Sequence, residues 1–118
     1  MIEARPPAPG TVLCALDEID DPGARGFDFR QGDAIFAGFV VRRGDEVFGY
    51  VDDCPHAGWR LGSLDERYLN RQGDKILCFC HGALFEIEDG AAAAGPCPPG
   101  AKLTPWPVAV RDGMVVTA

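Results

Sequence analysis

The sequence contains no apolar run close to the ~20 residues that a membrane-spanning helix requires. Residues 1–10 also lack the charged-then-apolar pattern of a secretory signal peptide. We therefore predict a cytoplasmic protein that does not associate with membranes. In that reducing compartment, the five cysteines of the chain are expected to be metal ligands, reactive thiols or small core residues rather than a disulfide framework.

Basic side chains are scarce as well. The chain has 11 lysines and arginines against 18 aspartates and glutamates, which gives a formal net charge of −7 and a pI near 4.6. A nucleic-acid-binding protein needs a basic face, so we expect no nucleic-acid partner. The acidic balance favours steering toward a positively charged protein partner and serves solubility equally well. We interpret the following acidic residues as solvent-exposed edges rather than as a docking patch: Asp52, Asp53, Asp65, Glu66, Glu86, Glu88 and Asp89.

Helical periodicity is rare, and short β-rich runs separated by turn signals take its place. The Asp112-Gly113 turn between two such runs is the strongest hairpin signal. Cys14, Phe36 and Trp106 are expected in the core. With 118 residues, the sequence predicts one all-β domain over residues 1–118, a small antiparallel sandwich or barrel with a loop-rich insertion at about 53–82. The expected strands are residues 10–16, 33–42, 46–51, 75–79, 84–88, 103–111 and 114–117.

Two clusters combine cysteine with the two histidines of the chain, as Cys54-x-His56 and Cys78-x-x-His81. A single zinc ion could accept two thiolates and two imidazoles. Zinc sites, however, usually place two to four residues between paired ligands, because both side chains converge on one ion. The single residue between Cys54 and His56 suits two adjacent metal atoms instead, as in a two-iron, two-sulfide cluster with both cysteines on one iron and both histidines on the other.

The residues around these pairs resemble the Rieske iron–sulfur proteins. Residues 54–59 (CPHAGW) and 78–85 (CFCHGALF) are similar to the two cluster-binding loops of that family, and 95–100 (GPCPPG) is similar to its proline-rich shielding loop. The resemblance covers about residues 34–118. It implies a Rieske-type β base with an inserted cluster-binding subdomain. It also implies one 2Fe-2S cluster, which is held by Cys54, His56, Cys78 and His81.

The resemblance also bears on the other thiols. Cys80 stands where respiratory Rieske proteins carry a disulfide cysteine, but the position of its usual partner is occupied by Trp59. A loop-to-loop disulfide of that kind cannot form, and a tryptophan there resembles the soluble Rieske ferredoxins. Cys97, in the proline-rich segment, leaves two possibilities open: a pair with Cys80 under oxidation, or two free thiols.

The resemblance further implies a low reduction potential. High-potential respiratory members place a serine two residues after the second histidine ligand and a tyrosine four residues after it, and both hydroxyls donate hydrogen bonds to sulfur. Here these positions are Ala83 and Phe85. Because such donors stabilise the reduced state, their absence predicts a potential of roughly −150 mV, at the low end of the Rieske range.

These inferences favour an electron carrier without catalytic residues. An oxygenase would need a second iron held by two further histidines and a carboxylate. The chain contains only two histidines, His56 and His81, and both are already assigned to the cluster. We predict a ferredoxin that passes electrons from a reductase to a terminal oxygenase. The alternatives are the small Rieske subunit of a nitrite-reductase-like enzyme, bound to its large subunit, and a redox sensor that uses the iron–sulfur cluster or the thiols.

Overall fold

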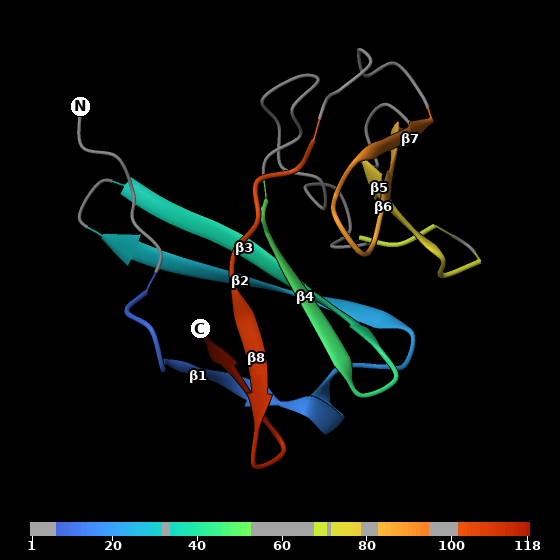
Figure 1. Ribbon diagram of the computed structural model, residues 1–118. Coiled ribbons are helices and arrows are strands. Elements are labelled where there is room, and N and C mark those ends of the chain that lie inside the picture. Colours follow the sequence, from blue (N-terminus) through green and yellow to red (C-terminus); the bar gives the residue numbers. More distant parts are fainter. Residues whose placement is uncertain (1–6, 32–33, 53–67, 71, 79–82, 95–101) are drawn as a thin grey trace.

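The computed structural model describes residues 7–31, 34–52, 68–70, 72–78, 83–94 and 102–118. These residues form β-strands and one short 3-10 helix, with no α-helix among them, which confirms the all-β prediction (Figure 1). In the described part of the chain, no helix is long and apolar enough to cross a membrane. The elements are β1 (Val12–Ala15), η1 (Leu16–Glu18), β2 (Gly23–Gln31), β3 (Ala34–Arg43), β4 (Glu46–Val51), β5 (Lys75–Cys78), β6 (Ala83–Glu86), β7 (Ala92–Ala94), β8 (Val108–Arg111) and β9 (Met114–Thr117).

The strands form three antiparallel sheets of three strands each. Their orders are β1-β9-β8, β2-β3-β4 and β5-β6-β7. Strand β8 lies beside β4, so the first two sheets make up the base of the molecule, and the β5–β7 sheet lies to one side of it (Figure 1). The chain reaches this third sheet directly from β4, through residues 53–74, and returns from it to β8.

Strand β3 is buried on both faces, and this explains its almost continuous apolar sequence. Successive side chains of a strand point to opposite faces. Phe39 and Val41 therefore enter one core and Phe36 and Val40 the other. The distal core consists of Phe39, Val41, Tyr50, Tyr68, Ile76, Phe85, Ile87 and Leu103. The basal core consists of Cys14, Leu16, Ile19, Phe36, Val40, Trp106 and Val115.

The predicted hairpin at Asp112-Gly113 is confirmed. Arg111 pairs with Met114, which leaves a two-residue connection between β8 and β9. Both connecting residues have positive φ, 52° at Asp112 and 76° at Gly113. This is the type I′ geometry whose twist matches that of the flanking strands.

The strand predictions needed three corrections. Strands β2 and β7 were not expected, although β2 pairs with β3 along its whole length. The predicted run 103–111 was too long, because regular strand begins only at Val108. Proline has no N–H to donate to a ladder, and Pro105 and Pro107 precede that strand. Pro105 forms only an isolated bridge with Tyr50.

Candidate functional site

Only one of the four predicted ligands lies within the described residues. Cys78 ends β5, and its backbone pairs with Ala83 at the start of β6. Residues 79–82 therefore join the two strands of a hairpin. The other predicted ligands, Cys54, His56 and His81, lie outside the described residues, as do Trp59, Cys80 and Cys97.

The structure does describe the residues from which both ligand-bearing segments start. The first segment, 53–67, begins after Asp52 and ends before Tyr68. The Tyr68 hydroxyl donates a hydrogen bond to Asp52 Oδ2 at 3.0 Å. The Leu77 N–H donates to the Tyr68 carbonyl at 2.8 Å, next to Cys78. Tyr68 therefore connects the beginning and end of the first segment with the beginning of the second.

The backbone before the first segment is fixed from two sides. The Asp52 N–H donates to the Ala37 carbonyl and the Val51 N–H to the Thr104 carbonyl, both at 2.9 Å. The proline-rich segment also starts and ends near paired backbone, because Ala91 and Lys102, on either side of it, form an antiparallel bridge. All three predicted loops therefore emerge from hydrogen-bonded backbone.

Asp52 corrects the interpretation of the acidic residues. The residue is 4% exposed, whereas the sequence predicted a solvated edge. Glu86 and Glu88 do lie at the surface, where they form ion pairs with Lys75 at 3.5 Å and with Arg43 at 2.7 Å. Asp89 is exposed, and Asp53, Asp65 and Glu66 lie outside the described residues.

The hydrogen bonds that link Asp52, Tyr68 and Leu77 fit an iron–sulfur cluster held between two segments. They bring the start of the Cys54/His56 segment close to the strand that ends in Cys78, and the donor set contains two thiolates and two imidazoles, as such a cluster requires. Within the described ranges, no group of three histidine, cysteine or acidic side chains could hold a different metal ion. Cys14 is a free thiol in the basal core, as predicted, and burial raises its pKa.

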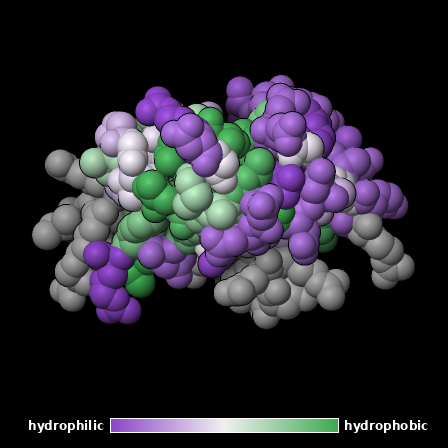
Figure 2. All heavy atoms as spheres, turned by 90° about the horizontal axis from the view of Figure 1, so that it is seen from below, coloured by the Kyte–Doolittle hydropathy of each residue, from purple (hydrophilic) through white to green (hydrophobic). Residues whose placement is uncertain are grey.

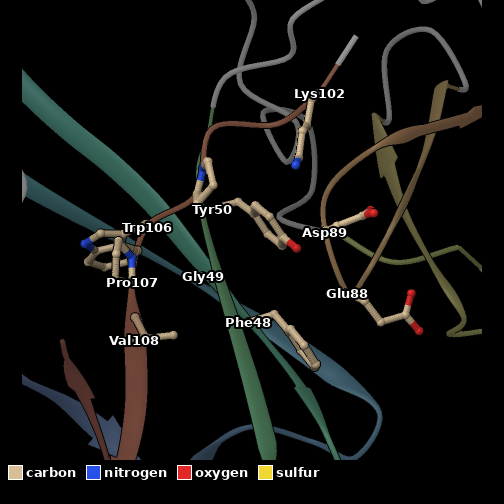
Figure 3. A pocket seen from close by; sticks show the side chains of 10 residues that line it. Phe48, Gly49, Tyr50, Glu88, Asp89, Lys102, Trp106, Pro107 and Val108 are labelled. Atoms are coloured by element: carbon tan, nitrogen blue, oxygen red, sulfur yellow. The ribbon is translucent and has the colours of Figure 1, made fainter. Parts of the chain in front are cut away.

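A pocket of about 370 Å³ lies between β4, the turn after β6 and residues 102–108 (Figure 3). Tyr50 points from β4 toward that turn, and its hydroxyl donates to the Ile87 carbonyl at 2.5 Å. Burial, together with the nearby Asp89 and Glu88 carboxylates, raises the pKa of Tyr50 to about 12. The tyrosine thus fastens the β5–β7 sheet to the base, and Glu88 at the rim already binds Arg43. Tyr50 and Glu88 therefore make contacts that stabilise the fold.

The underside of the base, where β1 and the β8–β9 turn lie, shows apolar residues gathered in the middle and hydrophilic residues around them (Figure 2). Among the described residues, the large apolar side chains with substantial exposure are Val12 at 57% and Ile35 at 50%. Two large apolar residues with this exposure are ordinary for a folded domain.

Comparison with known proteins yields one family and several relatives. A model of the Rieske [2Fe-2S] domain matches residues 11–107. Ferredoxin CarAc of Metapseudomonas resinovorans is 34% identical over 106 residues, which are 90% of this chain and 90% of the relative. The 3-phenylpropionate/cinnamic acid dioxygenase ferredoxin subunit of Photorhabdus laumondii is 29% identical over 103 residues, 87% of this chain and 88% of the relative.

A solved structure extends this comparison to three dimensions. It is a complex of reduced oxygenase and oxidized ferredoxin in carbazole 1,9a-dioxygenase, and one of its chains matches with a TM-score of 0.70. The sequence identity is 27%, and the match covers 91% of this chain and 90% of that chain. The similarity therefore extends over nearly the whole length of both chains.

Proposed function

The chain belongs to the Rieske [2Fe-2S] domain family and carries one two-iron, two-sulfide cluster, and on this premise we propose that it passes electrons from a reductase to a terminal oxygenase. It is an electron-transfer component rather than a catalyst. The observation that carries the proposal is the match over 90% of both chains to a protein that is itself a ferredoxin. The relative described as a dioxygenase ferredoxin subunit, and the solved complex of an oxygenase with a ferredoxin, support the choice of partner.

We propose Cys54 and Cys78 as ligands of one iron and His56 and His81 as ligands of the other. When bound, the cluster would supply one-electron redox chemistry at its irons, which the two thiolates and two imidazoles would hold. The hydrogen bonds at Tyr68, which join the starts of both segments, support this ligand set. In this proposal residues 1–118 form a single domain that works in the cytoplasm. Residues 53–82 are its cluster-binding insertion, and the proline-rich residues 95–100 shield the cluster.

The experiment combines metal analysis with turnover. Anaerobically purified protein should contain two irons and two acid-labile sulfides per chain and show a Rieske-type electron-spin signal when reduced. Added to a ferredoxin reductase and a Rieske oxygenase, it should make product formation depend on its concentration. Replacing any of the four ligands by alanine should abolish both signal and turnover, whereas Cys14→Ser and Cys80→Ala should retain both.

Two outcomes would contradict this proposal. Stoichiometric zinc without a visible chromophore would exclude the iron–sulfur cluster. A fully loaded protein that the reductase reduces, but that supports no more turnover than the Cys78→Ala variant with any of several Rieske oxygenases, would exclude the carrier role.

A further inference from the structure

A buried hydrogen bond lies at the foot of the first ligand segment. Asp52 and Tyr68 are 4% and 3% exposed, and the Tyr68 hydroxyl lies 3.0 Å from Asp52 Oδ2. The Tyr68 ring stacks on Phe39, with centroids 4.6 Å apart and planes 14° from parallel. A hydroxyl that donates to a carboxylate makes one of the stronger hydrogen bonds in proteins. The ring is therefore fixed by stacking and its hydroxyl by the hydrogen bond to Asp52.

The position of the hydroxyl depends on a glycine in a neighbouring strand. Gly26 of β2 stands opposite Phe39 in the β2–β3 ladder. A Cβ atom at residue 26 would collide with the Tyr68 hydroxyl. Glycine in the interior of a strand weakens the strand and often marks a close approach. Here it provides the space in which the hydroxyl reaches Asp52.

Asp52 and Tyr68 lie next to the two ends of the first ligand segment, and Tyr68 is also bound to the strand that leads into the second. Asp52 precedes Cys54 by two residues, and its N–H is fixed to Ala37 of β3. Tyr68 directly follows the same segment, and its carbonyl accepts the N–H of Leu77, which immediately precedes Cys78. A shift of Tyr68 would therefore move the Cys54 segment relative to Cys78.

We propose that Asp52 and Tyr68 are positioning residues that hold the two ligand segments in register, so that retention of the iron–sulfur cluster depends on the Tyr68 hydroxyl. This inference rests on the ligand set of the proposed function. The proposed role belongs to the hydroxyl and not to the ring, because a phenylalanine at residue 68 would stack on Phe39 equally well without binding Asp52.

The test compares two buried tyrosines of the distal core. Tyr68→Phe removes the hydroxyl between the ligand segments, whereas Tyr50→Phe removes a hydroxyl that donates to Ile87, away from them. Both variants should unfold at lower denaturant concentration than the wild type. Only Tyr68→Phe should lose the cluster faster to a chelator, by about tenfold as followed by visible absorbance, and only it should shift the midpoint potential.

Three further variants keep the test independent of a single substitution. Gly26→Ala leaves both partners intact but occupies the space of the hydroxyl, so it should lose the cluster as fast as Tyr68→Phe. Asp52→Leu removes the acceptor and should behave likewise. Asp52→Asn keeps an acceptor oxygen of the same shape and should restore cluster loss to within about threefold of the wild-type rate.

The inference is overturned if Tyr68→Phe and Gly26→Ala release the cluster at the wild-type rate, or if Tyr50→Phe releases it as fast as Tyr68→Phe. Neither result touches the proposed function, because the wild type would still bind its cluster and support turnover. Conversely, wild-type protein without iron and sulfide would refute the proposed ligand set before any of these variants is compared.

Discussion

Ala83 is the residue of β6 that pairs directly with Cys78 of β5. The resemblance to the Rieske proteins places residue 83 where high-potential members carry a serine whose hydroxyl donates a hydrogen bond to sulfur and stabilises the reduced state. We expect a wild-type midpoint potential near −150 mV. Ala83→Ser should raise it by roughly 20–65 mV, because a hydrogen bond worth about 0.5–1.5 kcal/mol more to the reduced state shifts a one-electron couple by that amount. Protein-film voltammetry measures both values.

A matched control and a second tuning position sharpen this prediction. Ala92→Ser makes the same change on β7, opposite Phe85 rather than Cys78, and should leave the potential unchanged. Phe85→Tyr should also raise the potential by tens of millivolts where its hydroxyl reaches sulfur. The Phe85 ring is fully buried in the distal core, so this variant should also cost stability. A wild-type potential above about +150 mV would contradict the tuning argument.

At the same scale, the residues differ in how far the sequence reveals them. Mixed Cys/His pairs at these spacings have few chemical interpretations, and the Cys14 core position follows from its apolar neighbours. Asp52 was misread, because two adjacent aspartates are typical of a solvated loop. The buried Asp52 carboxylate accepts a hydrogen bond from Tyr68, a partner sixteen residues further along the chain. No local pattern signals such a partner.

At the scale of elements, the β8–β9 hairpin depends on the backbone of its turn. Gly113 has a φ of 76°, and an added Cβ there would meet no atom within 4 Å. Gly113→Ala should therefore cost about 1 kcal/mol of unfolding free energy through backbone strain alone. Asp112→Asn is the matched control and should be nearly neutral, because asparagine tolerates a φ of 52° at that position. Urea unfolding followed by circular dichroism measures both.

The same hairpin tests whether the base and the ligand segments are independent elements. It belongs to the β1-β9-β8 sheet, whereas Cys78 belongs to the β5-β6-β7 sheet. Gly113→Ala should therefore leave the rate of cluster loss to a chelator unchanged. Faster loss would show that strain in the terminal sheet reaches the ligand segments.

Elements differed in how well the sequence predicted them. Strand β3 was predicted because burial on both faces produces a long apolar run. Strand β2 was missed: Phe27 and Phe29 alternate with charged residues, the correct period for a half-buried strand, but glycines and charges dilute the signal. Strand β7 is an alanine run whose strand conformation is set by pairing with β6. Such pairing is a tertiary contact, which local propensity does not encode.

At the scale of the whole molecule, β3 divides the fold into two cores with different relations to the iron–sulfur cluster. The basal core lies between the two base sheets, and none of its described residues adjoins a ligand segment. The distal core includes Tyr68, which directly follows the first segment, and Ile76 and Phe85 of the β5–β6 hairpin. Energy released by cluster binding should therefore stabilise the distal part of the molecule more than the base.

Removal of the cluster tests this division through two similar backbone hydrogen bonds. The Leu77 N–H donates to the Tyr68 carbonyl and the Trp106 N–H to the Gly49 carbonyl, both at 2.8 Å. In protein stripped by a chelator, or in Cys78→Ala, peptides containing Leu77 should exchange amide hydrogen about tenfold faster than in the loaded protein. Peptides containing Trp106 should exchange at an unchanged rate, because the basal core persists without ligation. Hydrogen exchange followed by mass spectrometry distinguishes the outcomes. Equal acceleration at both sites would mean that the cluster stabilises the entire fold, and no acceleration at either would mean that the β5–β6 hairpin holds its conformation without ligation.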